Sequence, residues 1–327
     1  MTNPNTILVT GGNGFIGSRV VEQLLDIGHK VAVLDDNSSP SYYARRNQNR
    51  AGATFYKQDI RNPDIYADIV AKHDIMGVIH LAAKHFIPFC NAFPRLTEEV
   101  NTAGTYTVHH YATTHHIPIV FASSAAVYCH PNNKTAESAD ALTVDNADIY
   151  SSTKIRGEKI LAAGSTPYAA LRFFNVYGAF DPHEHLIPKL VRHALDGSAK
   201  IQLGSKDSIR DYVYVDDVAQ AVITSMQHVL STRQSFTSDV ASGRGTSVNE
   251  LVDTLLAVHA SSSTSHPSPL ISYEVCAFRR PKDIKLLESD AEHSRLLKKL
   301  GCTPTTPLQK GLQLTLAVEK SARSLLC

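Results

Sequence analysis

Tyr150 and Lys154 are the pair of side chains in this sequence best suited to acid–base chemistry. They lie four residues apart, so a helix over this stretch would place them on one face. An exposed tyrosine has a pKa near ~10, and a neighbouring ammonium favours its phenolate form. Tyr150 is therefore a candidate general base, with Lys154 beside it. Ser124, at the end of a predicted strand, is placed to share a hydrogen bond with a substrate hydroxyl.

A surface tyrosine–lysine pair is the alternative interpretation, and the preceding elements decide against it. Residues 7–10 are typical of a buried strand, and they run directly into a loop with Gly11, Gly14 and Gly17. At a strand–helix junction, such glycines permit a tight turn, close approach of a pyrophosphate and close helix packing. The next helix, which begins with Phe15 and Ile16, would direct its free N–H groups at the phosphates. We therefore predict a dinucleotide cofactor bound by these five residues.

Asp35 ends the next predicted strand, at about the ~20-residue offset where an acid binds the ribose hydroxyls of NAD. A carboxylate there would repel the 2′-phosphate of NADP, so NAD is favoured. Asp36 and Asn37 are adjacent candidates for the adenosine, and residues 38–50 are expected to form an exposed loop. Asp59 and Ile60, after the third strand, could hold the adenine amino group and flank its ring.

Two further strands complete the predicted cofactor half. The fourth, over 77–83, ends in Leu81, Ala82 and Ala83, where small side chains leave room for a cofactor; the fifth, over 117–124, ends in Ser123. A long helix over 92–115 lies between them and contains Asn101, which with Ser123 and Phe174 is another candidate cofactor residue. Alternating strands and helices predict an α/β fold with a Rossmann-like, doubly wound parallel sheet. Its ligand crevice would lie at the carboxyl ends of the strands.

Composition excludes several classes of protein. The chain has 327 residues, 43% of them hydrophobic, which allows a large core and one or two domains. Its 32 basic and 31 acidic residues leave a charge of +1, so we expect no nucleic-acid partner. Apolar runs fall short of the ~18 residues that span a bilayer, and the first residues lack signal-peptide features. The five cysteines are scattered, which favours a reduced cytoplasmic protein without a metal site.

The motifs together resemble the extended short-chain dehydrogenase/reductase family, in its nucleotide-sugar epimerase/dehydratase branch. The motifs that carry the resemblance are Thr10–Gly17, His80–Ala83, Ser123–Tyr128, Tyr150 with Lys154, Leu171–Gly178, Arg210–Val218 and Arg280-Pro281. They span nearly the whole chain in the family's order.

This resemblance implies an NAD(H) held permanently and a nucleoside-diphosphate sugar, expected to be UDP-linked, as substrate. Tyr150 would take the proton from the sugar O4 while hydride leaves C4, and the 4-keto sugar would take the hydride back on its other face. Arg210 and Arg280 would pair with the diphosphate. The substrate-binding residues implied are His85, Ser124, Ala125, Ala126, Tyr150, Asn175, His185, Leu186, Arg210 and Arg280.

The resemblance also implies a division of the chain and an assembly. Residues 1–174, with a return segment near 211–235, would form the NAD-binding Rossmann domain. Residues 175–210 and 236–327 would form a smaller α/β domain that binds the sugar nucleotide. A homodimer would form through the helices near 92–115 and 150–163.

Ala125 and Ala126 discriminate among the family's reactions, because the 4,6-dehydratases carry an Asp-Glu pair at this place. Alanines supply neither acid nor base for water loss, so we expect 4-epimerisation. His85, Ala126, His185, Lys282 and Cys129 depart from the residues usual in 4-epimerases and leave the sugar open. A dehydratase or other 4-keto-sugar enzyme, and a non-catalytic NAD-binding regulator, are the alternatives.

Overall fold

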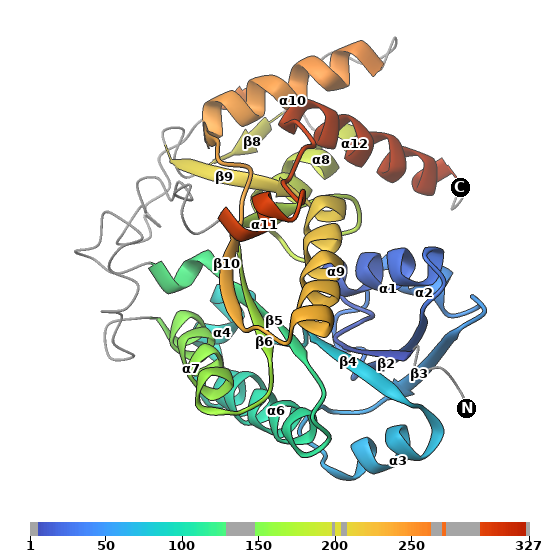
Figure 1. The fold of residues 1–327 in the computed structure, drawn as a ribbon. Helices are drawn as coiled ribbons and strands as arrows, with labels where there is room; N and C mark the ends of the chain where they lie inside the picture. Colours follow the sequence, from blue (N-terminus) through green and yellow to red (C-terminus); the bar gives the residue numbers. More distant parts are fainter. Residues whose placement is uncertain are drawn as a thin grey trace.

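The computed structural model describes residues 6–128, 148–197, 200–203, 208–262, 270–272 and 295–324. Its centre is a seven-stranded parallel sheet with the order β10-β6-β5-β4-β1-β2-β3, which confirms the predicted fold class (Figure 1). The strands are β1 (Thr6–Thr10), β2 (Lys30–Asp35), β3 (Ala53–Lys57), β4 (Ile75–His80), β5 (Ile119–Ser124), β6 (Tyr168–Phe173) and β10 (Phe236–Val240).

Helices cover both faces of this sheet because its strands are apolar on both sides. On β1, Ile7 and Val9 enter one hydrophobic core and Leu8 enters the other, as the two-residue period of a strand requires. The first core includes residues of α1 (Phe15–Asp26) and α9 (Val215–Thr232). The second includes residues of α3 (Asp64–Lys72), α6 (Gly104–Thr114) and α7 (Ile149–Ala163).

The point where the strand order reverses fixes the position of the crevice. β1 pairs with β2 on one side and with β4 on the other. The strands β2 and β3 therefore extend the sheet in one direction from β1, and the strands from β4 onward extend it in the opposite direction. In open α/β sheets, ligands bind at the carboxyl ends of the strands at this switch point. The glycine loop that comes after β1 therefore lies at the mouth of the crevice.

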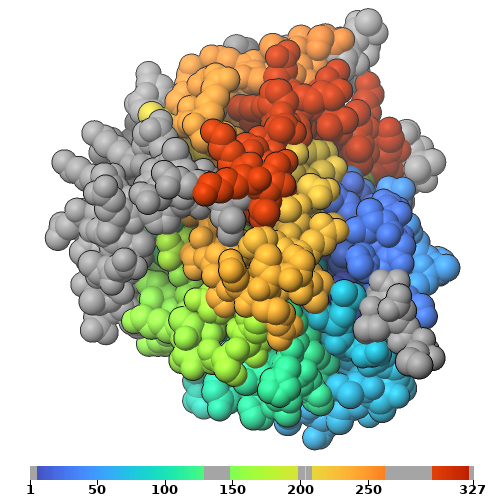
Figure 2. Space-filling view, in the orientation of Figure 1, coloured from blue at the N-terminus to red at the C-terminus, as the bar shows by residue number. Residues whose placement is uncertain are grey.

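A second lobe is built mainly from the C-terminal half. It contains a three-stranded sheet of β7 (Asn175–Tyr177), β9 (Ile209–Tyr214) and β11 (Gly245–Ser247), and the pair β8 (Lys200–Gln202) and β12 (Leu270–Ser272). Three helices pack there around a third core: α8 (Leu186–Asp196), α10 (Val248–Ser262) and α12 (Leu308–Ser324). Figure 2 shows this orange-to-red lobe at one end and the blue-to-green half at the other.

Three expectations about elements differ from the structure, and the first two concern residues 38–50 and the return segment. Residues 38–50 contain a helix, α2 (Tyr42–Asn47), where we expected an exposed loop. Tyr43 and Asn47 lie four residues apart and pack on α1: the guanidinium of Arg19 lies 4.5 Å from the Tyr43 ring centroid, and Asn47 donates to the carbonyl of Ser18. The return segment also extends past residue 235, because β10 pairs with β6 in the large sheet.

The long helix expected over 92–115 is interrupted. The chain forms α4 (Ile87–Ala92), α5 (Pro94–Glu98), a π-helical turn (Glu99–Ala103) and then α6. The π turn contains Asn101, and such turns occur frequently at functional sites. α11 (Arg295–Lys299) packs against α9 and β10.

Candidate active site

Ser124 and Tyr150 meet at the carboxyl end of β5. Ser124 is the last residue of that strand, and its hydroxyl lies close enough to the phenol of Tyr150, in the first turn of α7, to favour the phenolate form. Asp148 caps this helix, accepting from the backbone N–H and the hydroxyl of Ser151 at 3.0 and 2.9 Å. The cap determines where α7 begins and therefore where Tyr150 projects. The structure thus brings two of the three predicted catalytic residues close together.

Lys154 completes the group one helical turn later. Its side chain is only 4% exposed, and its ammonium lies 5.8 Å from the centroid of the Tyr150 ring. The ammonium donates to the carbonyl of Ala122 at 2.7 Å, which leaves two of its three hydrogens for other partners. Burial lowers the pKa of Lys154 to about 8.

The chain's own residues do not lower the pKa of Tyr150; the lowering that we expect comes from Lys154 together with the positive charge of bound NAD⁺ and is not tested without the cofactor. Burial raises the pKa of Tyr150 to about 12, and the polar side chain of Ser124 opposes this shift only in part. The neighbouring thiol of Cys90 and the carboxylate of Asp148 raise it further. Because desolvation disfavours the phenolate, a positive charge brought by a ligand is needed to make Tyr150 a base near neutral pH.

The glycine loop has the close contacts of a phosphate cradle. Gly11 has a φ of +70°, and a Cβ there would lie 2.6 Å from the backbone nitrogen of Ala82. A Cβ on Gly17 would lie 2.0 Å from the carbonyl oxygen of Gly11. α1 begins at Phe15, and its N-cap residue, Gly14, has no side chain to bond the free N–H groups of the first turn. These free N–H groups, which include that of Ile16, fit a pyrophosphate.

Asp35 lies at the end of β2, where its carboxylate faces the glycine loop. It is buried and accepts from the backbone N–H groups of Asn13 and Asn37, at 3.0 and 2.7 Å. Burial raises the pKa of Asp35 although these two bonds lower it. The side-chain oxygen of Asn13 is buried without a partner in the described part of the chain. This free acceptor and Asp35 fit the hydroxyls of a ribose, and sequence reasoning missed Asn13.

The candidate adenosine residues lie beside Asp35. Asp36 accepts from the backbone N–H of Ser38 at 2.8 Å, and Asp59 forms an ion pair with Arg61 at 2.6 Å. The bond from Arg61 lowers the pKa of Asp59, so its carboxylate is charged. Ile60 and Phe174 are buried, whereas Leu81, Ala82 and Ala83 are half-buried where β4 ends.

Two predicted cofactor residues bond to the protein itself. Successive residues of a strand point to opposite faces, so Ser123 points away from Ser124 and donates to Glu158 at 2.5 Å. The side-chain amide of Asn101 accepts from the backbone N–H of Lys84 at 2.7 Å and donates to Lys84 and Thr153. Both residues therefore fix the walls of the crevice.

The predicted substrate residues come from both lobes. Ala125 and Ala126 form a tight turn after Ser124, and Asn175 donates to the carbonyl of Asp211 at 3.0 Å. Arg210 donates to the carbonyl of Ile209 at 2.8 Å. His185 bonds Asp181, its ring lies 5.9 Å from that of His85, and Leu186 begins α8. Arg280 and Lys282, like Cys129, fall outside the described residues.

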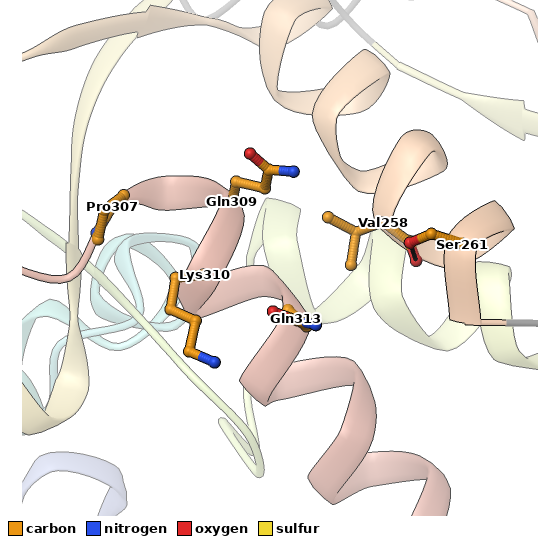
Figure 3. Close-up of a pocket in the computed structure, with 6 residues that line it drawn as sticks. All are labelled: Val258, Ser261, Pro307, Gln309, Lys310 and Gln313. Carbon is orange, nitrogen blue, oxygen red and sulfur yellow. Dashed lines mark hydrogen bonds between the residues drawn. The ribbon is translucent and has the colours of Figure 1, made fainter.

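A separate hollow lies in the second lobe between α10 and α12 (Figure 3). Its volume is about 290 Å³, and it contains none of the predicted site residues. It is lined by Val258, Ser261, Pro307, Gln309, Lys310 and Gln313. Among the residues that the structure describes, no group of His, Cys, Asp and Glu could hold a metal ion. Those residues also contain no helix long and apolar enough to cross a membrane.

Known proteins with similar sequences support the geometry. A chain of Halalkalibacterium halodurans named UDP-glucose 4-epimerase is 32% identical, over 92% of this chain and 91% of its own. A solved UDP-glucose 4-epimerase of Stenotrophomonas maltophila, with bound NAD and formylated UDP-arabinopyranose, superimposes with a TM-score of 0.85. It is 26% identical, and the match covers 98% of this chain and 99% of that one.

A solved UDP-N-acetylglucosamine 4-epimerase of Methanobrevibacter ruminantium, in complex with UDP-N-acetylmuramic acid, also has a fold similar to that of this chain. Its TM-score is 0.81 at 27% identity, and the match covers 98% of this chain and all of that one. The sequence pattern of one family, described as the NAD dependent epimerase/dehydratase family, matches residues 7–237. With its glycine cradle, Asp35 and the Ser124–Tyr150–Lys154 group, this chain belongs to the NAD-dependent epimerase/dehydratase family.

Proposed function

We propose that this protein is an NAD-dependent nucleotide-sugar 4-epimerase, which inverts C4 of an NDP-hexose through a 4-keto intermediate. The observation that carries the proposal is the grouping of Ser124, Tyr150 and buried Lys154 at the mouth of a dinucleotide cradle, with the Lys154 ammonium 5.8 Å from the centroid of the Tyr150 ring. The relatives named above as 4-epimerases support it. UDP-linked hexoses are the substrates we propose, because these relatives carry UDP-sugars in their names.

The chain's own residues handle the proton of the sugar O4 hydroxyl. Tyr150 accepts this proton, and Ser124 holds the same oxygen by a hydrogen bond. Bound NAD⁺ supplies the acceptor for the C4 hydrogen and the positive charge that lowers the pKa of Tyr150. When O4 becomes a carbonyl oxygen, the hydroxyls of Tyr150 and Ser124 both donate to it. Lys154, fixed by the carbonyl of Ala122, keeps a positive charge beneath the phenol.

Elimination of water is disfavoured by the two residues next to Ser124. Removing water from C5 and C6 needs an acid and a base near those atoms, and Ala125 and Ala126 provide neither. Release of a stable 4-keto product is therefore not expected, and the sugar takes the hydrogen back at C4.

NAD rather than NADP is the cofactor we propose, because Asp35 is buried at the ribose end of the cradle and charged. The 2′-phosphate of NADP would lie beside the negative carboxylate of Asp35 and be repelled by it. Among the described residues, no cation bonds to either oxygen of this carboxylate to offset the repulsion. Denaturing the purified protein and assaying the released dinucleotide tests this: NADP would contradict it.

A cytoplasmic homodimer is the assembly we propose. The exposed aromatic side chains of Phe93 and Tyr106, 54% and 61% exposed, lie before α5 and on α6, in the region where the resemblance places the interface. Light scattering of wild type and Tyr106→Glu tests it: a monomeric wild type would contradict it.

The activity is tested by incubating the purified protein with UDP-glucose, UDP-galactose and their N-acetyl forms. Proton NMR of the anomeric and C4 signals should show conversion toward an equilibrium mixture. Tyr150→Phe should lower the rate about 10²–10⁴-fold, the usual contribution of a positioned acid–base group. Loss of water from every sugar without C4 inversion would support the dehydratase alternative instead. An active Tyr150→Phe would favour a regulatory role.

A further inference from the structure

Three histidine rings from the two lobes converge at the crevice. His85 lies in the loop after β4, and His183 and His185 lie in the loop before α8. The ring centroids are 4.4 Å apart for His85 and His183, 5.9 Å for His85 and His185, and 5.6 Å for His183 and His185. We call these three residues the histidine cluster. It joins the cofactor half of the molecule to the second lobe.

The rings are held in place but keep a surface for a ligand. Phe86 stacks on His183 at 5.5 Å, with 14° between the planes. The Nδ1 of His185 lies 2.7 Å from the carboxylate of buried Asp181, so Nδ1–H donates there and Nε2 points elsewhere. His85 is exposed even though protein atoms surround it closely enough to desolvate its charged form. The ring of His85 is therefore accessible to a ligand although protein atoms lie around it.

The charged groups around the cluster are of both signs, and the ammonium of Lys84 lies 3.6 Å from the carboxylate of Asp36. Lys84 lies beside His85 in sequence and acts on His183, and Lys154 of α7 acts on His85. Asp181 is the neighbouring acid and is bonded to His185, while Glu184 forms an ion pair with Arg192 at 2.6 Å. Desolvation by the surrounding protein atoms, followed by repulsion from the other two histidines, lowers the pKa of His85 to about 3. Burial also lowers the pKa of His183. Both rings are therefore uncharged at neutral pH in the free protein.

We propose that the histidine cluster is a subsite for an anionic group of the sugar nucleotide and that it takes up a proton when this anion binds. The inference rests on the proposed function, which supplies the sugar-nucleotide ligand. Two sources have the required chemistry: the diphosphate, common to all these substrates, and a carboxylate on the sugar. Repulsion among the three rings disfavours a protonated imidazole in the free protein. A bound anion offsets this repulsion and raises the pKa of the ring beside it, so that the ring takes up a proton.

Isothermal titration calorimetry tests the coupling. The protein is the NAD-loaded Tyr150→Phe variant, so that bound sugars do not turn over, and the ligands are UDP-glucose and UDP-glucuronate. Titrations in buffers of different ionisation enthalpy, between about pH 6 and 8.5, give the number of protons taken up. Both ligands stay fully ionised in this range, so any proton taken up binds to the protein.

We expect uptake of up to about one proton and a Kd that weakens by as much as ~10-fold per pH unit as the pH rises. Uptake with both ligands identifies the diphosphate as the anion, and uptake with UDP-glucuronate alone identifies a sugar carboxylate. Replacing His85, His183 and His185 together by Asn should abolish it, and His110→Asn, an exposed histidine on α6, should leave it unchanged.

The inference is overturned if neither ligand causes proton uptake. It is also overturned if uptake persists in the triple variant, because the proton would then bind to another group such as Lys154. The proposed function fails separately. If wild type inverts C4 but no uptake is found, only the histidine cluster loses its role. If neither sugar nucleotide binds to protein that retains NAD, both proposals fall.

Discussion

Glu158 lies on the same face of α7 as Tyr150 and Lys154, and its replacement by Gln tests whether that face acts as a unit. Its carboxylate accepts from Arg172 at 2.9 and 2.7 Å and from Ser123 at 2.5 Å. The side chains of Arg172 and Glu158 are only 12% and 17% exposed. Arg172 also donates to the hydroxyl of Tyr128 at 2.8 Å. Glu158→Gln therefore leaves a buried guanidinium without its counter-charge.

The expected cost in stability comes from this burial. Removing one partner of a buried ion pair lowers the free energy of unfolding by about 3–5 kcal/mol. Gln keeps one oxygen that can accept a hydrogen bond, so we expect Glu158→Gln to cost about 3 kcal/mol. The double variant with Arg172→Met removes both charges and should recover much of the loss. Glu98→Gln is the matched control: its ion pair with Arg156 is 34% and 39% exposed and should contribute less than ~1 kcal/mol. Urea denaturation measures all three.

A pH profile separates a functional role from a structural one. The negative charge of Glu158 raises the pKa of Lys154, which burial holds at about 8. Without Glu158 that pKa falls, and Lys154 loses its proton at lower pH. Since the ammonium supports Tyr150, kcat should decline with rising pH earlier in Glu158→Gln than in wild type. An unchanged profile together with unchanged stability would refute this reasoning.

Three other substitutions test separate parts of the site. Lys154→Met should abolish C4 inversion yet raise the free energy of unfolding at neutral pH by about 1–3 kcal/mol, measured in urea, because burial lowers the Lys154 pKa from 10.5 to about 8. In wild type, the buried ammonium of Lys154 loses its proton as the pH rises from about 8 toward 10.5, the pKa of an unperturbed lysine. The cost of burying its charge disappears over this pH range, so the free energy of unfolding should increase. Gly17→Ala places a Cβ 2.0 Å from the carbonyl of Gly11, and the purified variant should contain no dinucleotide. Asp35→Asn should weaken NAD binding by about 1.5–3 kcal/mol, the value of a hydrogen bond to a charged group, and narrow the preference for NAD over NADP; equal affinities in wild type would show that Asp35 does not discriminate.

The sheet, the cradle and the Ser124–Tyr150–Lys154 group could be predicted because local rules determine them. Alternating apolar strands and helices fix the doubly wound sheet, and the four-residue spacing of Tyr150 and Lys154 fixes their common face. The position of Asp35 beside the glycine loop could be predicted from its place at the end of the second strand, and its role toward the cofactor stays a prediction.

Residues whose role depends on distant partners could not be predicted in the same way. Asn47 looked like part of a polar loop, but it bonds the carbonyl of Ser18 across to α1. Ser123 and Asn101 stay predicted cofactor residues, but the partners of their side chains, Glu158 and Lys84, come from other elements and could not be read from the sequence. The pKa of Tyr150 depends on burial, which residue spacing does not reveal.

The convergence of the three histidines is another property of the folded chain. His85 lies about a hundred residues before His183 and His185, and they meet because the fold brings the loop before α8 against the loop after β4. Resemblance to the family motifs identified two of these positions as unusual, without indicating that they share one site.

Transfer of a deuterium label tests the central claim most directly. UDP-glucose carrying deuterium at C4 is incubated with wild-type protein in ordinary water, and the product is examined by NMR and mass spectrometry. We predict UDP-galactose that keeps its deuterium at C4, with no hydrogen gained from water, because hydrogen leaves and returns at that carbon. Deuterium found at C6 of a product that has lost water would contradict it.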